Sequence, residues 1–258
     1  MSVVICVIAK HEDPYIHEWI QYHLKLGVDH IYLYDNHFVS HYHPLATEYS
    51  KRVTVFHLPG HCMQMSAYYH FLHYARALPG DVRPTWVAFI DVDEFIVIRG
   101  DSASLIRALM ATVRDDAGAL GLNWVLFGNN DQETHDTGRG VLERFTRRQQ
   151  GVNPHIKSIV RLDAVQQMIS PHHAAFIDPA TVARDCDGVP IAGPYHPLGN
   201  DRVACIHHYF TKSNEEFYQK CQRGRADISD YRTFEADFHR HNFNDLEDYS
   251  ALDFWYKN

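Results

Sequence analysis

The sequence predicts an α/β domain whose central sheet is mostly parallel and is flanked by helices. Short apolar runs alternate with amphipathic stretches up to Phe95, in the order strand, helix, strand, strand, helix, strand. That order is typical of a parallel sheet with helices on both faces. The length of 258 residues suits one large α/β domain. The sequence contains no repeat, no low-complexity tract and no clear domain boundary, so we expect a single domain.

The first two elements have the clearest boundaries. Residues 3–9 form an apolar run that suits a buried strand. The next segment carries apolar residues at helical spacing. It is bounded by Asp13, a favourable N-cap, by Pro14 at the first helical position and by Gly27, a helix stop. We therefore expect a helix that ends near Leu26.

The remaining elements follow from the same patterns. Apolar runs predict strands at residues 30–34, 53–56, 86–90 and 120–127, and helical spacing predicts helices at 64–77 and 102–113. Residues 128–140 form a polar loop, long enough to be a lid or an acceptor-binding element. Strand or short helix is expected at 141–148 and 157–162, and irregular structure at 163–203. The segment from Ser213 onward is predicted to be helical, with Glu216, Lys220 and Arg223 on its polar face.

Composition and charge exclude several classes of protein. There are 24 Lys and Arg against 32 Asp and Glu, a net charge of −8, which disfavours nucleic-acid binding. The five cysteines are odd in number and lack CxxC spacing, so we expect reduced thiols. The apolar run at 3–9 stops at Lys10, too short for a membrane span and without the flanks of a signal peptide. We therefore expect a cytoplasmic protein.

Three of the predicted strands end in polar residues: at 10–12, at 35–36 and at Asp91 and Asp93. The carboxyl ends of parallel strands meet at one edge of a sheet, so a ligand crevice is expected there. Asp91 and Asp93 alternate in an extended segment, so both carboxylates can reach one ligand or cation. Hard oxygen ligands favour Mg²⁺ or Mn²⁺. The alternative is a solvated acidic strand end, but Glu94 adds a third carboxylate whose repulsion a cation would offset.

Twenty histidines are an unusual number for this length. None of them lies in a zinc-binding pattern such as HExxH. Most are therefore expected to be surface or hydrogen-bonded histidines that begin to charge as the pH falls towards 6.

Several motifs together resemble the glycosyltransferase family 2-like and family 92 group. The most specific are DVDEF at 91–95 and HYFTKS at 208–213 with the following Glu215-Glu216-Phe217, Lys220 and Arg223-Gly224. The resemblance spans residues 3 to about 225. It implies a GT-A fold and the inverting transfer of a sugar from a nucleoside-diphosphate sugar to a hydroxyl acceptor such as a glycan. UDP-sugar is the favoured donor, and Mn²⁺ or Mg²⁺ is the implied cofactor. It also implies a nucleotide-sugar half at 1–127, an acceptor half at 128–225 and a helical tail at 226–258.

The same resemblance implies roles for individual residues. The metal would be held by Asp91, Asp93 and His208, although His207 stands where relatives commonly have asparagine. Donor contacts are expected from these residues: Lys10, Glu12, Asp35, Asn36, Gln64, Asp91 and Lys212. Lys212 would lie over the pyrophosphate and stabilise the departing diphosphate.

Inverting transfer also needs a general base that takes the proton of the acceptor hydroxyl. Asp131 and Glu133 in the long loop and Glu143 in VLERF are the candidates, with Glu143 slightly favoured because ERF is a family-like pattern. A structural ion pair with a neighbouring arginine explains Glu143 equally well. His172 or His173 could also serve, and the sequence does not decide among them.

Two rival functions remain open. One is a nucleotide-sugar-binding module without turnover. The other is a DxD phosphohydrolase of the haloacid-dehalogenase type, disfavoured because such enzymes carry Thr or Val two residues after the second Asp, where this chain has Phe95. The expected partners are a nucleotide-sugar donor and a carbohydrate acceptor. The sequence leaves peripheral membrane contact and the oligomeric state open.

Overall fold

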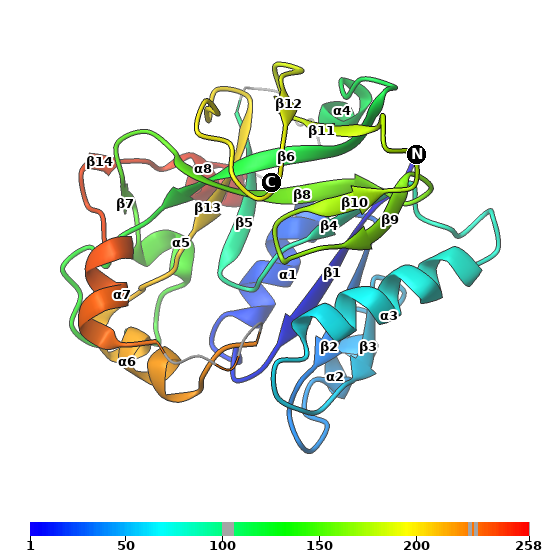
Figure 1. Ribbon diagram of the computed structural model, residues 1–258. Coiled ribbons are helices and arrows are strands. Elements are labelled where there is room, and N and C mark those ends of the chain that lie inside the picture. Colours follow the sequence, from blue (N-terminus) through cyan, green and yellow to red (C-terminus); the bar gives the residue numbers. More distant parts are fainter. Residues whose placement is uncertain (100–105, 227–228, 230–231, 258) are drawn as a thin grey trace.

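The structure is a computed structural model that describes residues 1–99, 106–226, 229 and 232–257. In this part of the chain one large sheet has the strand order β12-β11-β6-β8-β4-β1-β2-β3, and β13 and β5 join it beside β6 (Figure 1). The predicted α/β fold is confirmed. None of the helices in the described ranges has the length and apolar character needed to cross a bilayer.

The first third of the chain contains each strand and helix that the sequence predicts there. The elements are β1 (Val3–Ala9), α1 (Ile16–Lys25), β2 (His30–Asp35), α2 (His43–Glu48), β3 (Val53–His57), α3 (Gln64–Ala77) and β4 (Trp86–Phe89). Strands β4, β1, β2 and β3 are parallel neighbours. Helix α2 was not predicted, because a six-residue helix is too short to show a periodic pattern.

Helix α1 begins later than the sequence suggests. Asp13 does not cap it, since the helix starts at Ile16 and Tyr15 occupies the N-cap position. The backbone N–H groups of Tyr15 and Ile16 both donate to the carbonyl oxygen of Glu12, so the chain first makes a turn after β1. That turn brings Glu12 to the carboxyl end of the sheet.

The rest of the chain makes the sheet mixed rather than mostly parallel. Its elements are β5 (Glu94–Ile98), α4 (Ile106–Ala111), β6 (Ala117–Leu126), α5 (Val141–Arg144), β7 (Arg147–Arg148), β8 (Asn153–Arg161), β9 (Val165–Met168), β10 (Ala174–Phe176), β11 (Val182–Arg184), β12 (Pro190–Ile191), β13 (Ala204–His208), α6 (Asn214–Gln222), α7 (Phe234–His241), β14 (Leu246–Glu247) and α8 (Ser250–Lys257). Strand β8 lies between β6 and β4 and runs antiparallel to both, because the chain turns back after β6. The predicted helix at 102–113 is seen as α4, and residues 102–105 lie outside the described ranges.

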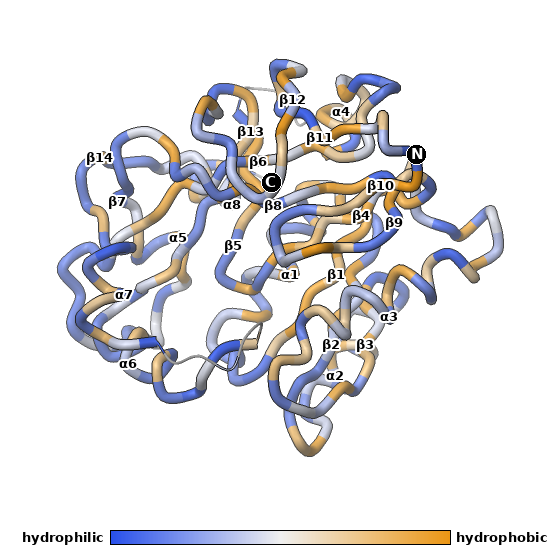
Figure 2. Tube along the Cα trace, in the orientation of Figure 1, coloured by the Kyte–Doolittle hydropathy of each residue, from blue (hydrophilic) through white to orange (hydrophobic). Residues whose placement is uncertain are grey.

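Strand β1 shows how the sheet is held between two apolar layers. All seven of its residues are buried. Val3, Ile5 and Val7 pack in the core that contains α1, whereas Val4 and Cys6 pack in the core that contains α3. Successive side chains of a strand point to opposite faces, so a strand covered on both sides must be apolar throughout. Figure 2 shows these apolar strands at the centre of the molecule.

The C-terminal segment packs back onto the domain. Strand β14 pairs with β7, and α8 contacts α5 and β5. Arg99 binds Asp248 through two hydrogen bonds of 3.2 and 2.8 Å. The predicted helical tail therefore contains α7 and α8, with β14 between them.

Candidate active site

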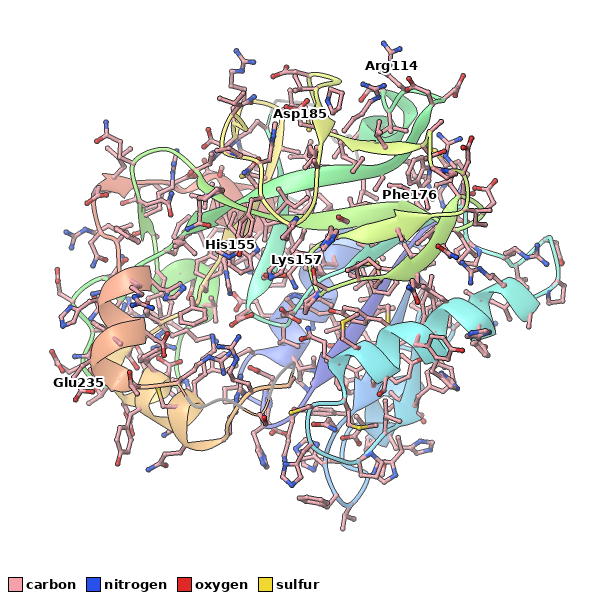
Figure 3. All side chains as sticks on the ribbon, in the orientation of Figure 1. Arg114, His155, Lys157, Phe176, Asp185 and Glu235 are labelled. Atoms are coloured by element: carbon pink, nitrogen blue, oxygen red, sulfur yellow. The ribbon has the colours of Figure 1, made fainter. Side chains whose placement is uncertain are left out.

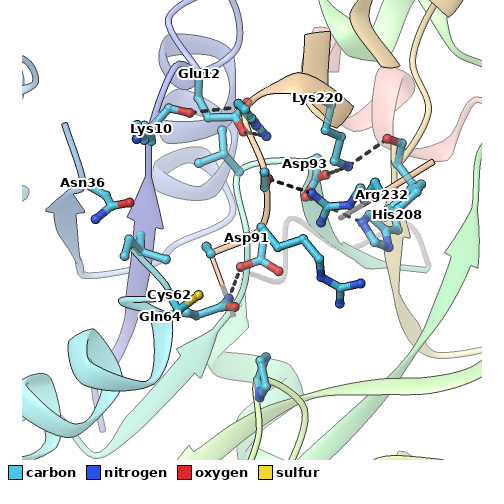
Figure 4. A pocket seen from close by; sticks show the side chains of 18 of the residues that line it. Lys10, Glu12, Asn36, Cys62, Gln64, Asp91, Asp93, His208, Lys220 and Arg232 are labelled. Atoms are coloured by element: carbon cyan, nitrogen blue, oxygen red, sulfur yellow. Dashed lines mark hydrogen bonds and ion pairs between the residues drawn. The ribbon is translucent and has the colours of Figure 1, made fainter. Parts of the chain in front are cut away.

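A pocket of about 270 Å³ opens at the carboxyl ends of β1, β2 and β4 (Figure 4). One side is formed by the segments that follow these strands and by the start of α3. The other side is formed by β6, β8 and β13, and α6 and α7 contribute further residues. Its lining includes seven of the expected metal and donor residues, namely Lys10, Glu12, Asn36, Gln64, Asp91, Asp93 and His208.

Asp91 is held by two neighbours. Gln64 Nε2 donates to its Oδ1 at 2.7 Å, and Lys157 Nζ donates to its Oδ2 at 2.8 Å. Lys157 is only 1% exposed and also lies 3.3 Å from Glu94 Oε2. Burial alone would lower the pKa of Lys157, but the two carboxyl groups outweigh it and hold that pKa well above its usual value. Asp91 therefore faces a protein cation.

Asp93 has a different set of neighbours. Lys220 Nζ donates to its Oδ2 at 2.6 Å, and Nε2 of His208 lies 3.6 Å from its Oδ1. Burial would raise the pKa of Asp93, yet Lys220 and His208 keep that pKa well below its usual value. The residue is thus an ionised carboxylate at 7% exposure, with one oxygen turned toward an imidazole.

Glu94 lies beneath this pair. It is paired in register with His208 across β5 and β13. Its Oε1 and the Nδ1 of His208 are 4.0 Å apart, and each is a buried polar atom without a hydrogen-bond partner among the described residues. Burial raises the pKa of Glu94 to about 8 and lowers the pKa of His208 to about 4. In this arrangement the imidazole is neutral.

The two adjacent histidines of β13 point in opposite directions, as extended residues must. His208 lines the pocket, and its ring lies 4.3 Å from the ring of Trp124. His207 packs on Phe127, with ring centroids 4.5 Å apart, and its Nε2 lies 3.7 Å from Asp248. The structure therefore places His208, and not His207, beside Asp93.

Asp93 and His208 suit a divalent cation in part. No three His, Cys, Asp or Glu side chains in the described ranges are grouped so as to hold a metal by themselves. One carboxylate oxygen and one neutral imidazole nitrogen nevertheless converge on the pocket. Mn²⁺ and Mg²⁺ commonly take one or two protein ligands and complete their coordination with water and substrate phosphates. The residues present fit such a cation through Asp93 and His208, whereas Asp91 is held apart by Lys157.

Arg223 ties the end of α6 to the loop after β1. Its Nη2 forms an ion pair with Glu12, and its Nη1 donates to the carbonyl oxygen of Lys10 at 3.0 Å. Glu216 and Lys220 of α6 are buried, which corrects the expectation of a polar outer face. The reason is that both are paired inward, Lys220 with Asp93 and Glu216 with Arg144.

Lys212 lies outside the main pocket. It lines an adjoining cavity of about 320 Å³, with its Nζ 4.2 Å from the centre of the Tyr15 ring. Its backbone has a φ of 52°, a left-handed conformation that is uncommon for residues other than glycine. Glu12, Lys220 and Arg223 line both cavities.

Asp35 is buried and organises a loop instead of facing the pocket. Its carboxylate accepts hydrogen bonds from the backbone N–H groups of His37, His41 and Tyr42. These bonds hold its pKa below the usual value although burial acts in the other direction. Asn36, the next residue, is the one that lines the pocket.

Of the candidate bases, His172 lines the pocket, whereas His173 and the three carboxylates do not. Asp131 pairs with Arg147 at 2.6 Å, Glu133 accepts a hydrogen bond from Asn214 at 2.6 Å, and Glu143 accepts one from the hydroxyl of Tyr256. The long loop that carries two of them is fastened to the C-terminal segment rather than placed over the pocket.

Asparagine side chains make that attachment. The oxygen of Asn242 accepts from the backbone N–H of Asn129 at 2.7 Å, and that of Asn244 accepts from Asn130 at 2.9 Å. These contacts join segments more than 110 residues apart, so no local sequence signal predicts them. The loop 128–140 is therefore packed against the C-terminal segment of the domain.

Some pocket residues were not singled out from the sequence. Trp124, His155 and His241 all line it. One signal was present: in HIKSIVR, His155 stands two residues before Lys157, and both line the pocket. Figure 3 labels both on β8.

The fold and the site define an α/β protein whose strand-end pocket combines carboxylates with buried basic groups, a combination suited to phosphate esters and their cations. The family model for glycosyltransferase family 92 matches residues 1–231. The chain belongs to this family.

Curated relatives carry the same family name. A glycosyltransferase family 92 protein of Oryza sativa subsp. japonica is 30% identical over 167 residues, which cover 64% of this chain and 27% of the relative. A family 92 protein of Arabidopsis thaliana is 27% identical over 175 residues, which cover 62% of this chain and 28% of the relative. The chain thus matches little more than a quarter of the length of these relatives.

Two solved structures of S. aureus TarS also align with this chain at 12% identity. The one in complex with UDP has a TM-score of 0.40 and covers 63% of this chain and 47% of that chain. The other has a TM-score of 0.44, and its alignment covers 86% of this chain and 64% of the TarS chain.

Proposed function

We propose that the protein is a metal-dependent, inverting glycosyltransferase that moves a sugar from UDP-sugar to a hydroxyl group of a carbohydrate. The observation that carries the proposal is the convergence of Asp93 Oδ1 and His208 Nε2, 3.6 Å apart, in the strand-end pocket of a family 92 chain. Such a pair suits a cation shared with a diphosphate.

The proposal assigns the donor to the side formed by β1, β2 and α3. Lys10, Asn36 and Gln64 line that side and offer hydrogen bonds to a base and ribose. Arg223 supplies positive charge where the diphosphate would lie, and Lys220, whose pKa burial lowers to about 7, offers a hydrogen-bond donor there. A Mn²⁺ or Mg²⁺ ion held by Asp93 and His208 would add Lewis-acid charge beside the leaving group.

The reaction proposed is a single displacement. A lone pair of the acceptor oxygen forms a bond to the anomeric carbon on the face opposite the diphosphate. The bond from that carbon to the diphosphate oxygen breaks, and its electron pair leaves with UDP. The acceptor proton passes to a base. Lys220 and Arg223 stabilise the charge that develops on the leaving diphosphate.

The test is the Asp93→Asn variant. We expect it to weaken Mn²⁺ binding, measured by isothermal titration in the presence of UDP, and to reduce UDP release from a panel of UDP-sugars by a factor of at least about 100. Asp131→Asn, an exposed carboxylate outside the pocket, is the matched control. Circular dichroism checks that both variants fold.

Two results would count against the proposal. Equal Mn²⁺ affinity in Asp93→Asn and wild type would contradict the proposed metal site at Asp93. UDP binding by the wild type with no UDP release from any donor would favour the binding module without turnover.

A further inference from the structure

We infer that the pocket side formed by β6 and β8 is the acceptor-sugar subsite, and that His155 is the general base of the transfer. The inference rests on the proposed function. We call this side the acceptor wall and define it by Trp124 of β6, His155 of β8 and His172, which line the pocket, together with Tyr195, which packs on His155 beyond the lining.

The order of the sheet separates the acceptor wall from the donor side. Strand β4, which leads into Asp91 and Asp93, lies between β8 on one side and β1 on the other. The donor segments follow β1 and β2, whereas Trp124 belongs to β6 and His155 to β8. A sugar held at the diphosphate above Asp93 therefore has the acceptor wall on its other side.

The acceptor wall is aromatic. The rings of Trp124 and His155 stack with centroids 4.8 Å apart at 21°, and Tyr195 meets His155 edge-on at 4.7 Å. His172 meets Trp124 edge-on at 5.1 Å. Tyr195 is 53% exposed and extends the wall to the surface. Flat rings with polar edges suit the C–H face and hydroxyl rim of a pyranose better than a phosphate.

The hydrogen bonds of His155 fix its tautomer. Asn153 Oδ1 accepts from the backbone N–H of His155 at 3.0 Å and also lies 2.7 Å from its Nδ1. A backbone N–H can only donate, so this side-chain atom is the oxygen, and Nδ1 must carry a proton. Nε2 then has a free lone pair, and no other described residue bonds to it. Burial lowers the pKa of His155, so the ring is neutral at neutral pH.

The position of His155 in β8 brings it to the same pocket as Asp91 and Asp93. His155 stands two residues before Lys157, and both residues line the pocket (Figure 3). Lys157 Nζ reaches Asp91 at 2.8 Å. His155 also lines the pocket, so its Nε2 is placed to take the acceptor proton as the oxygen attacks the anomeric carbon. The proton later passes from the imidazolium to water.

The pocket carboxylates are less suited to this role. Glu12 is paired with Arg223, Asp91 with Lys157 and Asp93 with Lys220. The fourth, Asp237, accepts a hydrogen bond from the backbone N–H of Thr233.

The test compares His155→Asn with His173→Asn. Asparagine at 155 retains a donor at the Nδ1 position for Asn153 and removes Nε2. His173 belongs to the same segment as His172 but does not line the pocket. The substrates are UDP-sugars with a panel of methyl glycosides as acceptors. We expect His155→Asn to lower the acceptor-dependent kcat by about 10²–10⁴-fold, with UDP and Mn²⁺ affinity unchanged, and His173→Asn to behave as wild type.

The pH profile supplies a readout that a structural role would not move. A base must be unprotonated, so the wild-type rate should fall with acid as His155 takes up a proton. The rate of His155→Asn should not show this fall in acid. The titratable groups near His155 are His172, Tyr195 and His241, and His208 and Lys157 line the same pocket. All five remain in the variant, so the difference between the profiles belongs to His155. Tyr195→Ala should raise the acceptor KM with little change in kcat.

The outcomes are distinguishable. An active wild type with an equally active His155→Asn would overturn the inference and leave the proposed function intact. Weaker UDP binding in His155→Asn would also overturn it, because the residue would then belong to the donor site. A wild type that releases no UDP from any donor would overturn both.

Discussion

At the scale of single residues, the charge balance of the site depends on two buried lysines. Asp91, Asp93 and Glu94 place three carboxyl groups within four positions, and Lys157 and Lys220 contact them. The sequence predicts that such a cluster needs a cation. It does not show which side chains supply the charge, because Lys157 lies 66 residues and Lys220 127 residues from the aspartate it binds.

Glu94 should affect the metal through His208. If Nε2 of His208 held a cation, its Nδ1 would carry a proton, and the unpartnered Glu94 Oε1 lies 4.0 Å from that atom as an acceptor. We expect Glu94→Gln, which keeps the shape but replaces the carboxyl group with an amide, a weaker acceptor, to raise the Mn²⁺ dissociation constant about 10-fold or more. The measurement is a Mn²⁺ titration followed by electron paramagnetic resonance. His207→Asn is the control, and an equal change in both variants would contradict the role.

At the scale of elements, α6 joins the sequence motif to the site. Ser213 is its N-cap: the backbone N–H of Glu216 donates to Ser213 Oγ, and Glu216 Oε2 accepts from the backbone N–H of Ser213 at 3.0 Å. This capping box places Lys220 two turns later against Asp93. The helix could be predicted from its sequence. Its inward-facing charges could not, since they depend on Arg144 and Asp93 from distant segments.

Removal of the cap should weaken the whole domain. We expect Ser213→Ala to lower the free energy of unfolding by about 1 kcal/mol, within the range measured for N-cap serines. Ser66→Ala, at an exposed position of α3, is the control and should change it by less than about 0.5 kcal/mol. Urea denaturation measures both. If the two substitutions cost the same, the capping box does not stabilise the native state.

At the scale of the whole molecule, local patterns predicted the parallel half of the sheet and little of what surrounds the pocket. Strands β1, β2 and β4 are buried runs whose apolar residues identify them directly. The antiparallel position of β8 depends on how the chain turns back after β6. The spacing of apolar residues in the sequence does not indicate that direction. Asp35 shows the same limit at the site, because its position after a strand does not reveal that three loop amides would use its carboxylate.

Buried histidines should make the whole fold sensitive to acid. His23 is fully buried between α1 and β5: its Nδ1 bonds the carbonyl oxygen of Trp19 at 2.9 Å, and its Nε2 accepts from the backbone N–H of Ile96 at 3.3 Å. A protonated ring could not accept that bond. Burial lowers the pKa of His23 to about 3, below the value of about 6.5 expected in the unfolded chain.

The stability that His23 contributes is therefore complete above about pH 6.5 and is lost as the pH falls towards its folded pKa, because the unfolded chain takes up the proton first. Between pH 7.5 and 5.0 the loss from this one residue amounts to about 2 kcal/mol. We expect His23→Gln to be less stable than wild type at pH 7.5, and the gap between them to shrink by about 2 kcal/mol at pH 5.0. Urea denaturation of both proteins at the two pH values measures the gap. A gap that stays constant would mean that His23 takes up a proton equally in the folded and unfolded states, contrary to its buried position.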